Sequence, residues 1–570
     1  MAGHQPTRSA TVDNPELQDT QFSAGTAVAS NYGATADVDA SELAASKPTT
    51  GSARVLAPDL LRGLLMALMS LDHAAIFMGA WRHGTPKESE SDSTVFVEWN
   101  HTVAYISRTL THLCAPGFFF LMGMGTVYFA RSRTNLGWST WQMSRHFVVR
   151  GIALALVNEV MSLTFFARRG FWIVNIVLLG LAIDYVLSGL LCLAVNASES
   201  FLARMIVPKS QQAQQDASAT TPLLSSSSSN NTRRQAQPHA PSAANSSSSS
   251  SSHKSRAQTI SFWIHNLLLL ALTGVTIFWN VWLSPHHGQC VASGGQAASA
   301  VSVESQLLSG FWPSSEPQVH TSLLLLLLLP RPEHSSRGAW FDFWFYPVQT
   351  STVMSGFPPL AWLSFCILGI LYARVVLARR FPPATLVTAN LAVAVLLSAL
   401  FVATRLAHFG NLSEGCLRMP EQLAHPNANQ YLVSVKSFFF ITKYPPSPSF
   451  FFFTLACNFY LLALFGMLSA GTASRLPGLL NFGGSALFFY VVHMYLYTAL
   501  SIPVKRLFAH PLPSRDQPPG GNDWESSTGT GISPAFWLTW LLGLAILSPV
   551  CGAYARFKAT KPSDSLWRFF

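Results

Sequence analysis

Ten stretches of about 20 mainly apolar residues lie along this chain of 570 residues. A helix of that length crosses the roughly 30 Å hydrocarbon core of a bilayer, because each residue adds about 1.5 Å. The stretches are residues 60–79, 109–130, 147–166, 171–195, 260–283, 358–378, 384–408, 449–469, 482–504 and 532–553. The sequence therefore predicts an all-α fold, a polytopic membrane bundle of about ten helices.

The composition agrees with this prediction and excludes a string of soluble domains. Only 11% of the residues are charged, whereas a soluble chain carries roughly a quarter. The 36 Lys+Arg exceed the 26 Asp+Glu by ten, which gives a net charge of +10. No basic stripe with interleaved aromatic residues accompanies this excess, so we expect a lipid bilayer as partner and no nucleic acid.

The basic residues predict an orientation, since membrane proteins collect Lys and Arg on cytosolic loops. They cluster after the second span (Arg131, Arg133 and Arg145), after the sixth span (Arg379 and Arg380) and after the tenth span. Ten spans then place both termini in the cytosol and the odd-numbered loops outside. The membrane that holds the protein is left open.

The chain divides into four parts by composition. We expect a disordered N-terminal tail over 1–53, a first block of four spans over 54–195, a Ser-rich cytosolic linker over 196–258, and a second block of six spans over 259–570. The second block carries an outer insertion at 284–350. Its Leu run at 323–329 is too short to cross a bilayer and suits a re-entrant or interfacial piece.

Ionisable residues within spans are costly and therefore candidates for function. On the first span, Arg62 and His73 are 11 residues apart, which leaves them about 20° off one helix face and ~16.5 Å apart along the axis. Asp72 lies about a quarter-turn from His73. This face carries a cation at the cytosolic rim and an imidazole deeper in the membrane.

The other polar residues within spans share a depth on the expected outer side. His112, Glu159, Arg405 and His493 with Tyr497 all fall in that half. Their agreement predicts one polar cavity that opens to the non-cytosolic side. The alternative is that each histidine is a hydrogen-bonded core residue without a chemical role.

Two loop features belong to the same side. Lys443 and Tyr444 begin a turn with three prolines, which predicts a fixed loop at the mouth of the cavity or simply a Pro-rich helix start. Five of the seven cysteines lie within spans, while Cys290 and Cys416 lie in outer loops and are predicted to form a disulfide. No CxxC or HExxH spacing occurs, so no metal site is expected.

Several of these segments resemble one family. They are RVLAPDLLRG at 54–63, LMSLDH at 68–73, LTHLCAPGFFFLMG at 110–123, KYPPS at 443–447 and LFFYVVH at 487–493. They are similar to DUF1624, a family grouped with the heparan-alpha-glucosaminide N-acetyltransferase catalytic domain among the transmembrane acyltransferases. The resemblance covers most of 54–570 apart from the linker and 284–350. Arg62 and His73 also match the Arg-X10-His pattern of membrane acyltransferase-3 enzymes.

The resemblance implies a membrane-bound acyltransferase that moves an acyl group, expected to be acetyl, from cytosolic acetyl-CoA to an amine or hydroxyl acceptor, expected to be a sugar. It implies that His73 is catalytic, as a general base or a transient acyl carrier, with Asp72 or Glu159 setting its protonation. We expect His112 and His493 beside the acceptor. The CoA phosphates are assigned to Arg62, Arg145, Arg374 and Arg380, and the acceptor to Arg405, Lys443, Tyr444 and Tyr497.

Two other classes fit the same pattern of spans. A multi-pass transporter also surrounds midplane ionisable groups with helices, although the blocks of four and six spans show no matching broken segments. A membrane scaffold could keep the fold without the chemistry. The identity of the acceptor and the formation of a homo-oligomer are left open by the sequence.

Overall fold

The computed structural model describes residues 53–81, 89–166, 172–175, 177–206, 246–284, 286–290, 338–350, 353–379, 381–511, 528–562 and 567. This part of the chain is predominantly helical, and ten of its helical segments are long and apolar enough to cross a membrane. The predicted all-α, multi-pass architecture is therefore confirmed. The predicted tail before Ala53 and the Leu run at 323–329 lie outside the described residues.

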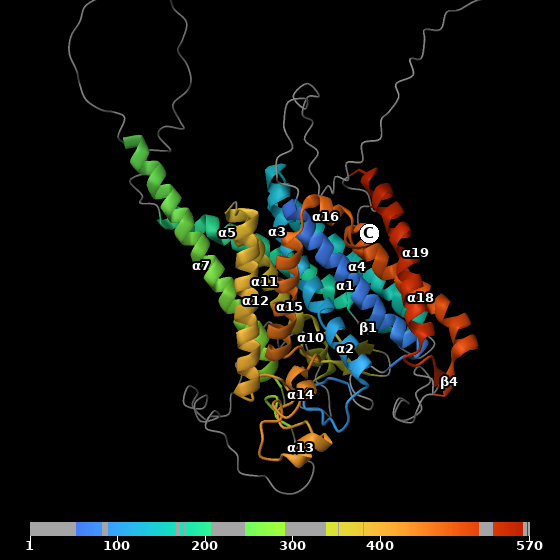
Figure 1. Cartoon of the computed structure of the whole chain (residues 1–570). Coiled ribbons are helices and arrows are strands. Elements are labelled where there is room, and N and C mark those ends of the chain that lie inside the picture. The colour runs from blue at the N-terminus through green and yellow to red at the C-terminus, as the bar shows by residue number, and fades with distance from the viewer. Residues whose placement is uncertain are drawn as a thin grey trace, which may run out of the picture.

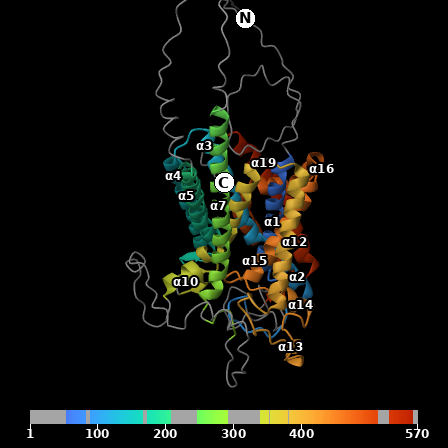
Figure 2. The ribbon, with the colours of Figure 1, turned by 90° about the vertical axis from the view of Figure 1, so that its left-hand side faces the viewer.

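The first block contains five helices, which are α1 (Ala53–Met78), α2 (Thr102–Thr111), α3 (Cys114–Asn135), α4 (Thr140–Phe166) and α5 (Leu178–Ile206). The long helices of the second block are α7 (Ser246–Trp282), α11 (Pro359–Ala378), α12 (Pro383–Leu406), α15 (Pro448–Met467), α18 (Ala486–Phe508) and α19 (Pro534–Ala559). Its short helices are α10 (Ala339–Phe345), α13 (Pro420–Ala424), α14 (Val435–Phe439), α16 (Ala470–Ser474) and α17 (Pro477–Gly484). Figures 1 and 2 show the long helices crossing together in one bundle.

Two predicted spans are each formed by two helices. The second span breaks between α2 and α3 at His112 and Leu113. Pro116 explains the break, because a proline ring clashes with the carbonyl four residues earlier, which here belongs to His112. The ninth predicted span breaks at Ser485, directly after two glycines that weaken a helix.

The predicted linker is shorter than its composition suggests. Helix α5 continues to Ile206, and α7 begins at Ser246 within the serine-rich sequence. Adding a residue to an existing helix is much easier than starting one, so the apolar spans extend helix into polar sequence. Residues 207–245 lie outside the described part of the chain.

One end of the bundle carries the small sheets and most of the loops, and we call it the loop-rich end. It consists of the described parts of 79–101, 172–177, 283–358, 407–447 and 509–533. Here β1 (Ile173–Asn175), β3 (Val353–Ser355) and β2 (Val348–Gln349) form one sheet, and β4 (His510–Pro511) pairs with β5 (Thr528–Gly529). In Figures 1 and 2, α13 and α14 lie at this end and α16 lies at the other. The predicted orientation across the membrane stays a prediction.

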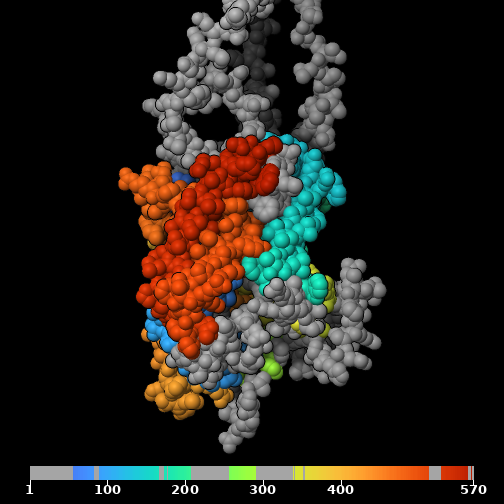
Figure 3. Space-filling view, turned by 90° about the vertical axis from the view of Figure 1, so that its right-hand side faces the viewer, coloured from blue at the N-terminus to red at the C-terminus, as the bar shows by residue number. Residues whose placement is uncertain are grey.

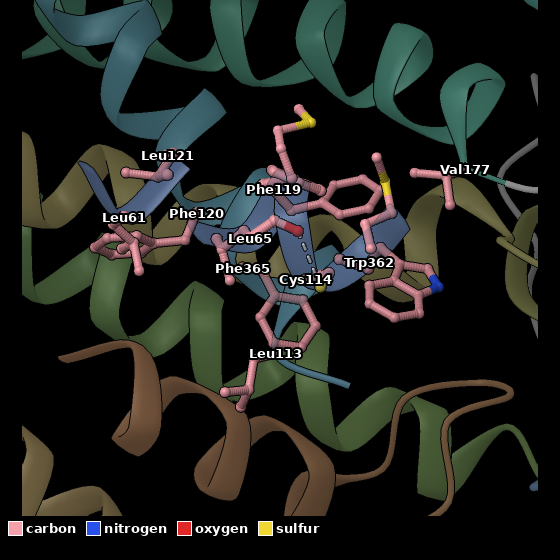
Figure 4. Close-up of a cluster of buried hydrophobic side chains, with 14 of the residues drawn as sticks. Leu61, Leu65, Leu113, Cys114, Phe119, Phe120, Leu121, Val177, Trp362 and Phe365 are labelled. Atoms are coloured by element: carbon pink, nitrogen blue, oxygen red, sulfur yellow. Dashed lines mark hydrogen bonds between the residues drawn. The ribbon is translucent and has the colours of Figure 1, made fainter. Parts of the chain in front are cut away.

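The centre of the bundle is held by close contact between α3 and α11. Gly123 lies against the carbonyl of Cys366, and Gly369 lies against the carbonyl of Phe120. Because glycine has no side chain, the two backbones can touch, as in other pairs of membrane helices. Figure 4 shows buried hydrophobic side chains of this core, among them Phe119 and Phe120 of α3 and Trp362 and Phe365 of α11. Figure 3 shows α18 and α19, in orange to red, on one outer face beside α4.

The predicted disulfide is confirmed. Cys290 and Cys416 are bonded, with their Cα atoms 5.2 Å apart and a sequence separation of 126. The bond joins the loop after α7 to the loop before α13 at the loop-rich end. Next to it, Phe96, Tyr431 and Phe440 form a second, smaller hydrophobic core under these loops.

We predict that Gly123→Ala lowers the stability of the folded protein by about 1–3 kcal/mol, the usual effect of overpacking, because the new Cβ would overlap a backbone carbonyl. Gly125→Ala on the same helix is the matched control, since nothing lies within 4 Å of a Cβ there. Thermal unfolding in detergent, followed by tryptophan fluorescence, measures both variants. Equal transition temperatures would contradict this view of the α3–α11 contact.

Candidate functional site

Two buried histidines from distant parts of the sequence meet between α1 and α18. Nδ1 of His73 lies 2.7 Å from Nε2 of His493, although 420 residues separate them. Their rings are stacked, with centroids 5.0 Å apart. The structure therefore brings together two of the predicted catalytic residues.

The hydrogen bonds fix which nitrogen carries a proton in the neutral pair. Nδ1 of His493 lies 2.9 Å from the carbonyl oxygen of Phe489. A carbonyl only accepts, so this Nδ1 is the donor, and Nε2 of His493 then accepts a hydrogen bond from Nδ1 of His73. The lone pair of a neutral His73 is consequently on its Nε2 atom.

Tyr490 lies beside both rings, with centroids 6.4 Å from His73 and 5.7 Å from His493. It also lines a small pocket, with room for about one water molecule, between α4 and α18. Asn158 lines the same pocket, and half-buried Glu159 accepts a hydrogen bond of 3.4 Å from Asn158. The side chain that bonds Nδ1 of His73 is thus His493, whereas the sequence analysis expected Asp72 or Glu159 to set the protonation of His73.

A cluster of buried charges starts at Asp72, the residue next to His73. Arg108 of α2 binds Oδ2 of Asp72 at 2.9 Å and Oε2 of Glu90 at 2.8 Å. Nε2 of His112 lies 3.1 Å from the same oxygen of Glu90. Asp72, Arg108, Glu90 and His112 form what we call the Arg108 cluster.

Glu90 is ionised in this cluster. Burial alone would raise the pKa of its carboxyl, but the Arg108 guanidinium and His112 together hold the pKa well below its ordinary value. A buried carboxylate of this kind has a fixed charge and a fixed position, because its neighbours satisfy its oxygens. It is suited to orienting His112 and Arg108 rather than to exchanging a proton near neutral pH.

The predicted loop at 443–447 closes over this cluster. The backbone N–H groups of Lys443 and Tyr444 donate to the backbone carbonyl of Glu90 at 3.0 and 3.1 Å. The Lys443 ammonium lies over the rings of Phe357 and Tyr444, at 5.3 and 5.2 Å from their centroids. The backbone of Lys443 and Tyr444 therefore lies against the Arg108 cluster, and their role in binding an acceptor stays a prediction.

A pocket opens beside the Arg108 cluster at the loop-rich end. It is lined by Glu90, Trp99, Asn100, Tyr105, Arg108, Thr109, His112, Phe439, Phe440 and Ile441. It has room for about one water molecule, so a sugar requires these loops to move apart. The structure thus holds separate small pockets at the histidine pair and at the cluster, where the sequence predicted one open cavity.

Two predicted acceptor residues have other roles. Arg405 is fully buried, donates to the carbonyl of Phe440 at 3.0 Å and lies 4.2 Å from the ring centroid of Tyr431. Tyr497 donates to the carbonyl of Trp540 at 2.9 Å. Both side chains join elements of the protein, so their polar groups are directed at protein atoms.

The four arginines assigned to the CoA phosphates differ in their surroundings and partners. Arg62 binds Asp59 at 2.9 Å and the carbonyl of Gly483 at 3.2 Å, and Arg145 is exposed on α4. The assignment of Arg374 to the CoA phosphates is corrected by the structure. Arg374 is buried and donates to Asn266 of α7 and to Asn196 and Glu199 of α5. Arg380 lies outside the described residues.

Glu90 and Arg108 are the members of the site that the sequence analysis missed. Arg108 lies one residue before the predicted second span, and Glu90 lies in a loop where acidic residues are common. The spacing of Arg108 and His112, four residues apart and so on one helix face, is the signal that could have indicated the pair.

Comparisons with known proteins add no assignment, since no family model matches the chain and a search of the curated proteins found no match. Within the described residues, no group of three or more His, Cys, Asp or Glu side chains is placed to hold a metal ion.

We predict that Glu90→Gln lowers stability at neutral pH by about 3 kcal/mol, because it removes one partner of a buried ion pair. The pKa of Glu90 is lowered by folding, so its contribution is complete above the ordinary value of 4.5 and is lost as the pH falls below that value. Chemical denaturation of both proteins between pH 3 and pH 7, in steps of about one unit, should show the difference shrinking toward acid. A difference that grows toward acid would contradict the assignment.

Proposed function

We propose that this protein is a membrane-bound acyltransferase that uses an acyl-CoA, expected to be acetyl-CoA, and an amine or hydroxyl acceptor, expected to be a sugar. The observation that carries the proposal is the pair formed by His73 and His493. It provides a basic nitrogen in a water-poor interior with its tautomer set by a second residue. The resemblance of the segments around His73 and His493 to transmembrane acyltransferases supports the same reading.

The pair suits general base catalysis at His73. The acceptor N–H or O–H would lose its proton to Nε2 of His73 while its lone pair bonds to the acyl carbon. The bond between that carbon and the CoA sulfur then breaks, and the sulfur takes the proton from His73. His493 stabilises the charged intermediate form of His73, since its Nε2 accepts a hydrogen bond from the ring.

The alternative role of His73, as a transient acyl carrier, uses the same atom. Nε2 would attack the acyl carbon, release the CoA thiol and later pass the acyl group to the acceptor. Rapid denaturation at neutral pH after mixing with radiolabelled acetyl-CoA and no acceptor separates the two routes, because only the carrier retains label on the protein.

The Arg108 cluster would position this chemistry. Arg108 ties Asp72, the neighbour of His73 on α1, to Glu90 and to α2. Lys443 is the first residue of the Pro-rich loop, and its ammonium lies over the ring of Tyr444. There it would face a polar acceptor. On the opposite end of the bundle, Arg62 and exposed Arg145 would meet the CoA phosphates.

We predict that His73→Ala lowers kcat for acyl transfer by about 10²–10⁴-fold, the usual contribution of a general base. His265→Ala is the control: His265 is also buried, but it bonds Ser198 and the Ser261 carbonyl between α5 and α7. Transfer from radiolabelled acetyl-CoA to a panel of amino sugars, with purified protein in liposomes, measures both. Full transfer by folded His73→Ala would refute the mechanism, and acceptor flux without transfer would favour a transporter.

We predict a graded effect at His493. His493→Phe keeps the ring packing but removes the acceptor, and should lower kcat about tenfold, the loss of one hydrogen bond worth ~1.4 kcal/mol. His493→Gln, whose side-chain oxygen can accept from His73, should recover part of the activity, while KM for the acceptor stays unchanged in both. Equal activities of the two variants would mean that His493 only fills space.

A further inference from the structure

Asp184 is a buried carboxyl that the candidate site does not use. It lies in the second turn of α5 and has no exposed surface. Neither of its oxygens has a hydrogen-bond partner within the described part of the chain. An ionised carboxylate without partners is very costly away from water, so this group needs a proton or a cation to remain there.

A stripe of polar side chains leads from Asp184 along α5. Ser188, Cys192 and Asn196 follow at steps of four residues, each about 6 Å further along the helix and on nearly the same face. Asn196 donates to Cys192 at 3.9 Å. These four residues form what we call the α5 polar stripe.

The stripe continues to solvent through an ion pair. Arg374 of α11 donates to Asn196 at 2.8 Å and also binds Glu199. The Glu199 side chain is 25% exposed at the end of the bundle opposite the loop-rich end. Asp184 and Glu199 are 15 residues apart, so the stripe covers about 22 Å of a hydrocarbon core of roughly 30 Å.

The helices packed against α5 bring few charges near Asp184. Cys366 of α11 is within electrostatic range of it. The other titratable or charged groups that face α5 belong to interactions further along the helix: Arg150 of α4 over Tyr185, His265 of α7 at Ser198, and Arg374 of α11 at Glu199. None of these contacts neutralises Asp184.

A proton suits this place better than a metal ion. Hard cations such as Na⁺ or Ca²⁺ need several oxygen ligands at once. The described residues contain no group of three or more acidic or metal-ligating side chains. A single carboxyl on a helix face that also carries hydroxyl, thiol and amide groups can instead take up one proton and pass it on.

We propose that Asp184 is a membrane-embedded proton-binding site, reached by protons along the α5 polar stripe from the Glu199 end. The site uses none of the residues that the proposed function assigns to acyl transfer, so the two proposals can be tested separately. The ligand is a proton delivered from the aqueous phase.

Infrared spectroscopy of the full-length protein in liposomes tests the proposal directly. The wild type at neutral pH should show the carbonyl band of a protonated carboxyl, the band should shift in D₂O, and Asp184→Asn should remove it. Glu421→Gln is the control, because Glu421 is a half-buried carboxyl outside the stripe that accepts hydrogen bonds from Trp99 and Ser434. A wild type without the band, or a band that persists in Asp184→Asn, would overturn the proposal.

Two further measurements control for misfolding and test the path of the proton along α5. Asp184→Asn should keep the thermal transition of the wild type, since it replaces a neutral carboxyl by a neutral amide, and Asp184→Glu should retain a shifted band. Ser188→Ala should slow deuterium exchange of the Asp184 band by removing the hydroxyl of the stripe that follows Asp184 along α5, which donates to the Tyr185 carbonyl at 3.3 Å. Unchanged exchange in Ser188→Ala would overturn the route along α5.

Discussion

A bilayer supplies no water to a polar group in its interior, and the arrangement of this protein follows from that constraint. Arg108 shows it most clearly, because one buried guanidinium binds Asp72 of α1, Glu90 of the following loop and, through Glu90, His112. Removing either carboxylate would take away one of the two anions that compensate this buried guanidinium. The Arg108 cluster therefore ties α1, at the residue next to His73, to α2 and to the loop between them.

Local backbone chemistry places the remaining members of the site. Pro116 ends α2 near His112 and so lets the imidazole approach Glu90 at a turn. The Pro-rich loop presents two N–H groups of Lys443 and Tyr444 to the carbonyl of Glu90. Across the bundle, glycines at 123 and 369 allow α3 and α11 to touch, and this contact sets the spacing of the helices around the site.

Much of the fold could be predicted from apolar length alone, because a bilayer demands about 20 apolar residues for each crossing. The disulfide was also predictable, since only two cysteines lie in loops. The sequence could place His73 and His493 at a similar depth in the membrane. It could not show that they touch, because depth says nothing about which helices are neighbours. Glu90 and Asp184 were missed for opposite reasons: one lies in an ordinary polar loop, and the other is a single acid within a strongly apolar run.

The pairing of α1 with α18 has a consequence for biosynthesis. Helix α1 emerges first, yet the partner of His73 is made 420 residues later, and the N–H groups that bind Glu90 come from the loop before α15. During translation the early helices must hold polar side chains whose final partners do not yet exist. An incomplete chain thus exposes unsatisfied polar groups to lipid, a feature that membrane chaperones and proteases can recognise before the last helices arrive.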